Sequence, residues 1–225
     1  MYLISHKGAA GLAHENSLDA IAAAKQYKPH YIEVDVHRTS DGVFVLYHGD
    51  IKQTYTGKNI PASYIKLKSV VPTLLKLEDL LRNDDRSCAF MFDIKCGDAV
   101  NDLIAFFNKH SLPKKSGFTT PHERTLVALK KAFPSALTLI SQPYQTGPIR
   151  PIELARDRGF DGISLNKWWL SPLPYFMCKY YKKQLMVYTI NHKFWMRWAK
   201  KLYPYAMICT NYPDKYRSSY PTDTT

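Results

Sequence analysis

Three short apolar runs carry charged or titratable residues where a buried strand would otherwise be hydrophobic. These runs are Ile32–Val36, Phe92–Lys95 and Val45–His48. Because the side chains of a strand alternate between its two faces, Glu33 and Asp35 share one side, as do Asp93 and Lys95. Carboxylates among apolar neighbours are costly unless something compensates their charge. For three converging carboxylates, a divalent cation is the simplest compensation.

The three carboxylates of Glu33, Asp35 and Asp93 are hard oxygen ligands, which suit one Mg²⁺ or Ca²⁺ ion better than Zn²⁺. The alternative is that they form ordinary ion pairs with nearby cations, which are Lys7, Arg38 and Lys95. Three carboxylates with few cations leave an excess of negative charge. We therefore predict a metal site at these residues.

His6 and His48 are the candidates for acid and base. Phosphodiester cleavage needs one group to take a proton from the attacking oxygen and another to protonate the leaving alkoxide, and two imidazoles can do both near pH 7. Lys7 and Lys95 can neutralise phosphate oxygens as point charges. The pattern predicts a metal-dependent hydrolase or lyase that acts on a phosphate ester. Of the other histidines, only His37 has the strand parity of the carboxylates, and the rest are predicted to be surface or structural.

Strand-like runs alternate with helix-like runs almost to the end of the chain. Eight strands are predicted, at residues 2–5, 31–36, 88–94, 117–119, 136–141, 162–165, 185–190 and 206–210. Helices are predicted between them, at residues 16–25, 73–81, 98–109, 122–133, 149–158, 172–183 and 193–202. Eight strand–helix units in 225 residues predict a single (β/α)₈ TIM barrel, with residues 1–225 as one domain.

An open doubly wound sheet is the alternative, but the first turn has no Gly-x-Gly-x-x-Gly spacing. A hairpin arm at Val43–Tyr47 and a polar, irregular insertion at about residues 49–72 are the predicted additions to the barrel. Active residues of such barrels lie where strands end. His6 follows the first strand and Asn191 the seventh, and His48 is expected to return from the hairpin to a position opposite Glu33.

The chain carries a net charge of +12, from 31 Lys and Arg against 19 Asp and Glu. Such a surplus is typical of an anionic partner or serves solubility. Lysines stand beside aromatic residues at 179–183 and 195–205, which is compatible with a peripheral contact to an anionic membrane. Nucleic acid is the less favoured partner, and helices with inward aromatics are the simplest explanation. Monomer and dimer stay equally open.

No apolar run approaches the ~20 residues of a membrane span, and the N-terminus does not resemble a secretory signal. We therefore expect a cytoplasmic protein, complete at its N-terminus, either free or peripheral to a membrane. The four cysteines lack metal-knuckle spacing and are expected to be reduced thiols, at positions 88, 96, 178 and 209.

At the residues singled out above, the chain resembles the glycerophosphodiester phosphodiesterase family. The family's blocks are His-Arg-Gly, Pro-Glu-Asn-Thr, Glu-x-Asp-Val, Thr-x-Asp-Gly, Val-x-x-His, Trp-Thr-Val-Asn and Thr-Asp/Asn-x-Pro. The corresponding segments are, in the same order, His6–Gly8, His14–Ser17, Glu33–Val36, Thr39–Gly42, Val45–His48, Tyr188–Asn191 and Thr210–Pro213. The likeness spans residues 4 to about 215 in the family's order, and its first half is the more specific.

The resemblance implies a TIM barrel with a divalent cation held by Glu33, Asp35 and Asp93. It implies that His6 and His48 are the general acid–base pair. The implied substrates are small glycerophosphodiesters, which the family cleaves to glycerol 3-phosphate and an alcohol. Attack by an adjacent hydroxyl of the substrate, with a cyclic phosphate as product, is one route.

The residues expected around the substrate and its phosphate are Lys7, Lys95, Tyr188 and Asn191. Two of them differ from the residue that the family has at the same position. Lys7 replaces Arg and loses its bidentate fork, and Tyr188 replaces Trp on the substrate wall. His14 replaces Pro, and Asp93 replaces the usual Glu with a shorter arm.

Some departures resemble a sister group, the sphingomyelinase D and phospholipase D toxins, which share Asp-x-Lys and Thr-Asn-Tyr-Pro-Asp. The toxins lack the segment that is present here as Glu15–Ser17, and this chain lacks their disulfide pattern. We therefore favour the phosphodiesterase. The alternatives are a lysophospholipase D or sphingomyelinase D-like enzyme acting on lysophospholipids, and a non-catalytic basic barrel that binds an anionic partner.

Overall fold

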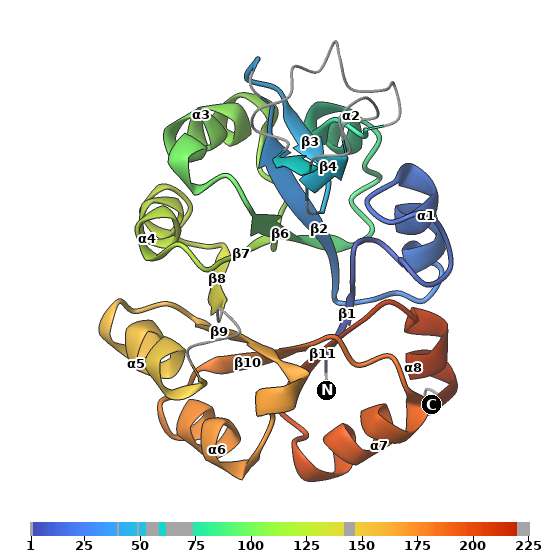
Figure 1. Cartoon of the computed structure of the whole chain (residues 1–225), viewed down its shortest axis with the longest axis vertical. Helices are drawn as coiled ribbons and strands as arrows, with labels where there is room; N and C mark the ends of the chain where they lie inside the picture. The colour runs from blue at the N-terminus through green and yellow to red at the C-terminus, as the bar shows by residue number, and fades with distance from the viewer. Residues whose placement is uncertain are drawn as a thin grey trace.

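Eight parallel strands close into a barrel, and helices surround it on the outside (Figure 1). The computed structural model describes residues 2–39, 41–48, 50–52, 59–61, 74–141 and 147–219. The barrel strands are β1 (Leu3–Ser5), β2 (Tyr31–Arg38), β6 (Ala89–Ile94), β7 (Gly117–Thr120), β8 (Leu137–Ser141), β9 (Gly162–Asn166), β10 (Gln184–Tyr188) and β11 (Met207–Thr210). Each pairs with its neighbour in chain order, and β1 closes the ring by pairing with β2 and β11. The predicted TIM barrel is confirmed.

The helices largely follow the predicted segments. They are α1 (Leu18–Lys25), α2 (Leu77–Arg82), α3 (Val100–His110), α4 (Glu123–Ala132), α5 (Ile149–Asp157), α6 (Pro172–Tyr180), α7 (Lys193–Leu202) and α8 (Pro213–Ser219), with the 3₁₀ turns η3 (Gly97–Ala99) and η4 (Lys167–Trp169). Helix α8 was not predicted. Helix α1 begins later than expected because the Ser17 hydroxyl, not Asn16, caps it by accepting the Ala20 N–H at 3.1 Å. None of the described helices is long and apolar enough to cross a membrane.

Two apolar layers hold the barrel, and the strand alternation separates them. On β2, Ile32, Val34 and Val36 pack outward into the large cluster beneath the helices. A smaller cluster fills the barrel interior and consists of Ile4, Met91, Leu139, Met186, Met207 and Cys209. Because both faces of each strand are covered, polar residues facing inward must find partners inside the barrel. This is the setting of Glu33 and Asp35.

A hairpin arm confirms the prediction for Val43–Tyr47. Strand β3 (Phe44–Leu46) pairs antiparallel with the last residues of β2, which continue past the predicted end at Val36. Within the insertion at 49–72, β4 (Asp50–Lys52) and β5 (Asn59–Pro61) form a two-stranded antiparallel sheet where the prediction was irregular. The rest of the insertion, and the predicted helix start at Thr73, lie outside the described residues.

Asp161, which lies just before β9, links the start of this strand to β8 and α4 at the amino-terminal end of the barrel. Its carboxylate accepts the backbone N–H of Thr138 at 2.8 Å and the Thr138 hydroxyl at 2.7 Å, and it pairs with Lys130 at 3.1 Å. Burial raises the pKa of Asp161, but the Thr138 hydrogen bonds and Lys130 outweigh it and hold this pKa below its usual range.

All four cysteines are free, as predicted.

We expect Asp161→Ala to lower the free energy of unfolding at neutral pH by roughly 1 to 2 kcal/mol, because the buried Thr138 N–H loses its acceptor. Since the folded-state pKa lies below the unfolded value, the contribution of the charge is complete above about pH 4 and is lost as pH falls through the lowered pKa. Urea unfolding near pH 7 and near pH 3 should show the smaller difference at acid pH. Asp157→Ala, on exposed α5, is the matched control with little change expected. Equal losses from Asp161→Ala at both pH values would contradict the charge argument.

Candidate active site

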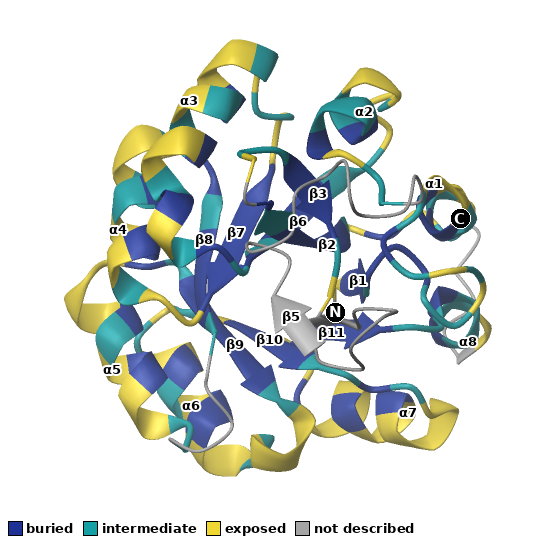
Figure 2. Ribbon diagram, turned by 45° about the horizontal axis from the view of Figure 1, so that its top comes forward, coloured by how far each residue is buried: buried dark blue, intermediate teal, exposed yellow. Residues whose placement is uncertain are grey.

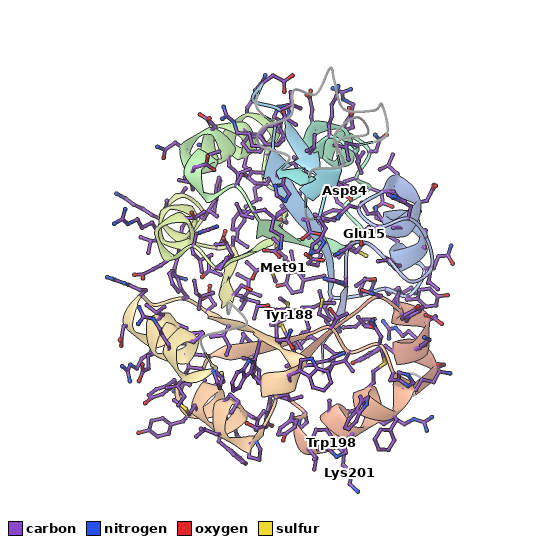
Figure 3. The ribbon with its side chains drawn as sticks, viewed as in Figure 1. Glu15, Asp84, Met91, Tyr188, Trp198 and Lys201 are labelled. Atoms are coloured by element: carbon purple, nitrogen blue, oxygen red, sulfur yellow. The ribbon has the colours of Figure 1, made fainter. Side chains whose placement is uncertain are left out.

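A cleft of about 490 Å³ opens at the carboxyl ends of the barrel strands. Its lining contains every residue that the sequence predicted for the site, namely His6, Lys7, Glu33, Asp35, His48, Asp93, Lys95, Tyr188 and Asn191. Figure 3 shows Met91 and Tyr188 in the middle of the barrel. The strand-end rule explains why residues so far apart in the sequence meet here. Their chemical roles stay predictions.

The three carboxylates project from the adjoining strands β2 and β6. Asp35 is the direct register partner of Asp93, and Glu33 lies two residues earlier on β2, on the same face. One oxygen from each of the three lies within 4.8 Å of the others. Glu33 and Asp35 are only 3% and 1% exposed. Such a concentration of buried negative charge is unfavourable unless cations balance it.

The pKa values of the three carboxyl groups reflect this crowding. Burial raises the pKa of Glu33 well above its usual range, and the charges of Asp35 and Asp93 add to the effect. Burial also raises the pKa of Asp93, against the opposing effect of Lys95. For Asp35, the effect of burial is outweighed by Lys95 and by a hydrogen bond from Asn16, so its pKa lies below the ordinary value. The charge of Lys95 alone does not neutralise the cluster.

Lys95 forms the ion pairs that the sequence analysis gave as the alternative to a metal. Its Nζ lies 2.5 Å from Asp93 Oδ2 and 3.2 Å from Asp35 Oδ1. Burial lowers the pKa of Lys95, but the two aspartates outweigh it and hold this pKa above its usual range. These pairs leave an oxygen over, because Asp93 Oδ1 is buried without a hydrogen-bond partner in the described part of the chain. Three hard oxygen donors with one oxygen unpartnered fit a Mg²⁺ or Ca²⁺ ion.

His6 follows β1 and is held by the loop after β11. Its Nδ1 lies 2.6 Å from the amide oxygen of Asn211, and its Nε2 lies 3.8 Å from Glu33 Oε2. Because an amide oxygen only accepts hydrogen bonds, Nδ1 carries the proton and Nε2 keeps its lone pair. Burial lowers the pKa of His6 to about 4 despite the Asn211 hydrogen bond. The imidazole is therefore neutral near pH 7, with its basic nitrogen toward the carboxylates.

His48 reaches the cleft through the hairpin. Strand β3 continues the edge of β2 beyond the end of β1, and the Tyr47 N–H donates to the Asp35 carbonyl at 3.2 Å. The register pairs Val36 with Leu46, where β3 ends, and His48 two residues later lines the same cleft as Glu33. His48 is exposed at the cleft wall. His37, the histidine that the sequence left open, packs near the Tyr47 ring and is outside the described cleft lining.

The loop after β1 holds Lys7 against the acidic cluster. Its backbone N–H donates to Glu33 Oε2 at 2.8 Å, and its Nζ donates to Glu15 Oε2 at 3.0 Å. Gly8 follows with φ +79°, and a Cβ there would lie 2.7 Å from the Cβ of Ala20. The close approach of α1 therefore requires a glycine at this turn. Lys7 lines the cleft, and its ammonium group forms an ion pair with Glu15.

Asn16 is a site residue that the sequence analysis did not single out. Its Nδ2 donates to Asp35 Oδ2 at 3.0 Å, and its Oδ1 accepts the Asp35 N–H at 3.1 Å. The residue is buried and has φ +56°, a left-handed conformation that asparagine tolerates better than most residues. This double contact fixes the Asp35 carboxylate. The sequence feature that could have identified Asn16 as a site residue was its position within the Glu15–Ser17 motif.

The loops after β10 and β11 position the other wall. The Asn191 side-chain oxygen accepts the Asn211 N–H at 3.0 Å and the Thr210 hydroxyl at 3.2 Å. Asn191 therefore orients Asn211, which in turn orients His6. The Tyr188 ring lies in the barrel interior, and burial raises the pKa of its hydroxyl. Asn211 was quoted only as part of a motif, and this chain of contacts supplies its place in the site.

Strand β9 and η4 add cleft residues that the sequence analysis did not name. These are Asn166, Lys167 and Trp168. The Asn166 side-chain oxygen accepts the Trp168 N–H at 3.1 Å and so begins η4. Asn166 could have been identified from the sequence, because it is a polar residue at the end of a predicted strand. The strand-end rule applied to the sixth strand finds Asn166, but it cannot find the tryptophan beyond it.

The barrel and its cleft have the features of a TIM-barrel enzyme, with charged groups gathered at the carboxyl ends of the strands. Residues 6–215 match the model of the glycerophosphoryl diester phosphodiesterase family. The chain therefore belongs to this family and is a phosphoric diester hydrolase. The alternative of a non-catalytic basic barrel is therefore not favoured. Among curated protein sequences, none matches the chain.

Solved structures with the same fold include two phosphodiesterases. A glycerophosphodiester phosphodiesterase from Parabacteroides distasonis is 19% identical, with a TM-score of 0.80, over 96% of this chain and 95% of that one. A phosphodiesterase from Oleispira antarctica is 20% identical, also with a TM-score of 0.80, over 97% and 96% of the two chains. The latter was solved in complex with the product sn-glycerol-3-phosphate. At these identities the likeness shows a shared fold.

Proposed function

We propose that this chain is a metal-dependent phosphodiesterase that cleaves glycerophosphodiesters to glycerol 3-phosphate and an alcohol, with His6 and His48 as the acid–base pair. The observation that carries the proposal is the buried Asp93 Oδ1, which lacks a hydrogen-bond partner among the described residues although two other carboxylates adjoin it. Asp84 Oδ2 is likewise unpartnered although Asp84 pairs with Lys25, so the weight rests on the convergence of three carboxylates at Asp93. The product bound to the Oleispira antarctica enzyme supports the substrate class.

One divalent cation, Mg²⁺ or Ca²⁺, would be held by Glu33, Asp35 and Asp93. When bound, it supplies stabilisation of the negative charge on phosphoryl oxygens. Asn16 and the Lys7 backbone hold two of these carboxylates in place from behind. Such outer contacts fix the direction of the ligands.

The side chains of this protein provide the remaining steps. Lys7 and Lys95 bring positive charge to the phosphate, and Tyr188 and Asn191 line the wall for the glycerol portion. His6 takes a proton from the attacking oxygen at Nε2, because Asn211 keeps the other nitrogen protonated. The attacking oxygen is either water or a neighbouring substrate hydroxyl, and the second choice gives a cyclic phosphate.

His48 faces the same cleft and protonates the leaving alkoxide. Its exposed position allows it to exchange protons with solvent between turnovers. Two histidines on separate elements, one after β1 and one after β3, therefore handle the two ends of the reaction. His6 is assigned as the base because burial lowers its pKa and keeps its imidazole neutral.

The proposal is tested by incubating the protein with glycerophosphocholine and following the reaction by phosphorus NMR. We expect loss of the diester signal, with glycerol 3-phosphate or a cyclic phosphate appearing. Exhaustive chelation should abolish turnover, because the ligands of the acidic cluster would lose their cation. Adding Mg²⁺ or Ca²⁺ back should restore it, and the two ions can be compared directly. Circular dichroism before and after chelation controls for unfolding, and full activity in the chelated, folded protein would overturn metal dependence.

A lysophospholipid is the second candidate substrate, and one observation favours it. An aromatic hollow of about 290 Å³ adjoins the cleft and is lined by Lys167, Trp168, Leu170, Ile190, Asn191, His192, Trp195, Trp198 and Ala199. This is about twice the ~150 Å³ of an apolar cavity that binds benzene. The hollow and the cleft share Lys167, Trp168 and Asn191. A parallel assay with lysophosphatidylcholine separates the two substrates, and absence of turnover there would remove this candidate.

A further inference from the structure

One sector of the barrel carries most of the net positive charge. Between residues 162 and 213 there are seven Lys and one Arg but no Asp or Glu. This stretch therefore contributes +8 to the total charge of +12, although it is less than a quarter of the chain. In the structure it forms β9, α6, β10, α7 and β11, which adjoin one another in the barrel (Figure 1). The charge is thus gathered on one side of the molecule.

The same sector holds most of the exposed apolar surface. Ten of the fifteen large hydrophobic side chains that are exposed in the described chain lie between residues 168 and 205. Figure 2 shows the exposed outer faces of α6 and α7. Scattered exposed hydrophobic residues are ordinary, but a cluster on one side marks an interaction surface.

Helix α7 has a wider apolar face than the barrel covers. Met196 and Ala199 are buried against the strands, as a surface helix requires. Phe194, Trp198 and Leu202 follow an i, i+4, i+8 row on the neighbouring face, and all three are exposed. Packing within the barrel accounts for only part of this apolar stripe. The remainder faces outward.

The exposed aromatic residues gather beside the catalytic cleft. We call Trp168, Phe194, Trp195 and Trp198 the aromatic rim. Trp168, Phe194 and Trp195 are 74%, 65% and 53% exposed. The Phe194 and Trp195 rings lie 5.1 Å apart, and those of Trp195 and Trp198 lie 5.7 Å apart. Three of the four also line the aromatic hollow, which therefore opens within the rim.

Cations border the aromatic rim. Lys167 Nζ lies 5.1 Å from the Trp168 ring centre. On α7, Lys193, Arg197 and Lys201 follow the i, i+4, i+8 spacing of a second row next to the aromatic one. Figure 3 shows Trp198 and Lys201 together on the outer side of α7. Long basic side chains on the border of an apolar face can extend their charges while their stems cover apolar surface.

We propose that the aromatic rim and its bordering cations form a docking surface for an anionic lipid bilayer. A helix with Trp, Phe and Leu on one face and Lys and Arg on the other is the pattern of an interfacial helix. Tryptophan is enriched at membrane interfaces, and basic residues gain energy from an anionic leaflet. The hollow within the rim has the size and lining for part of an acyl chain.

A bilayer fits this surface better than the other anionic partner, nucleic acid. Bases stack on aromatic rings, but exposed leucines such as Leu173 and Leu202 offer them nothing. Insertion into lipid buries leucine and tryptophan alike. The docking surface adjoins the cleft through Lys167 and Trp168, so docking places the mouth of the active site at the membrane. The inference concerns binding and stands whether or not the proposed substrate is correct.

The test is flotation of the full chain with two kinds of vesicle, phosphatidylcholine alone and phosphatidylcholine with roughly one third phosphatidylserine. We expect at least tenfold tighter binding to the anionic vesicles, and we expect this advantage to shrink as salt screens the charges. Equal binding to both vesicles, or none to either, would overturn the proposal.

Two variants separate the contributions of the surface. Phe194→Ser with Trp195→Ser should weaken binding to anionic vesicles at least tenfold, because two exposed rings no longer insert. Arg197→Gln with Lys201→Gln should cause roughly tenfold loss on anionic vesicles only. Val127→Ser with Leu18→Ser is the matched control, since these exposed side chains lie on α4 and α1, outside this sector.

Folding and alternative partners are controlled in the same experiment. Phe194→Leu with Trp195→Leu keeps an apolar surface and should retain most of the binding, and thermal melting confirms that each variant is folded. Losses in the control variant as large as those in the rim variant would overturn the surface assignment. Tighter binding to single-stranded nucleic acid than to vesicles would make nucleic acid the partner. A dimer that the serine variant dissociates would make a second copy the occupant.

Discussion

Replacement of His6 by Ala is expected to lower kcat/KM for glycerophosphocholine by roughly 10²- to 10⁴-fold, the usual contribution of one general acid–base group. The imidazole is neutral, its Nδ1 is committed to Asn211, and its Nε2 faces the carboxylates. No other described cleft residue offers a neutral imidazole in this position. Steady-state hydrolysis at saturating metal measures the effect.

The matched control is His37→Ala on the same strand that supplies two of the carboxylates. His37 packs near Tyr47, and hydrolysis should change less than about threefold. His48→Ala should show a loss comparable to that of His6→Ala if the leaving group is a poor one such as choline. With a p-nitrophenyl leaving group, which needs no proton, the loss for His48→Ala should be much smaller than for His6→Ala. Equal losses on both leaving groups would refute the assignment of His48 as the acid.

The strand alternation was enough to predict the inward carboxylates. Glu33 and Asp35 share a face with Asp93 because period two is a local property of the backbone, and β2 and β6 pair in register at Asp35 and Asp93. The strand count then predicted that the residues after the strands meet at one end. Every site residue proposed from the sequence lies in that cleft, most of them because they stand in or just after a barrel strand, and His48 because the hairpin of β3 returns to the same end.

The supporting contacts could not be predicted in the same way. Asn16 was expected to begin a helix, yet its side chain makes two hydrogen bonds to Asp35 and Ser17 takes the capping role. The orientation of Asn211 by Asn191 likewise joins two loops. Such contacts depend on how loops approach one another, which neither propensity nor periodicity encodes.

The exposure of the aromatic residues on α7 could not be predicted from the sequence either. The late aromatic and basic residues were most simply explained as helices with their aromatics inward. Met196 and Ala199 do face the barrel, but Phe194 and Trp195 face solvent. Periodicity identifies one apolar face of a helix, and it cannot say that the face is wider than the barrel covers.

Replacement of Asp93 by Asn is expected to lower kcat/KM by about 10³-fold, which corresponds to roughly 4 kcal/mol of lost stabilisation. Asn has nearly the shape of Asp but removes the charge that a cation requires. Isothermal titration of Mg²⁺ or Ca²⁺ into the variant should show at least tenfold weaker binding. Raising the metal concentration should recover part of the activity.

Asp93→Glu tests the same position by length rather than charge. The resemblance places a Glu here in the family, so the longer arm should retain metal binding and more activity than Asn does. The ion-pair alternative predicts a different pattern. If Asp93 only partners Lys95, then Asp93→Asn would leave the metal affinity unchanged, because Lys95 would still pair with Asp35 at 3.2 Å. Metal affinity that is unchanged in the Asn variant would therefore reject a ligand role for Asp93, whatever happened to turnover.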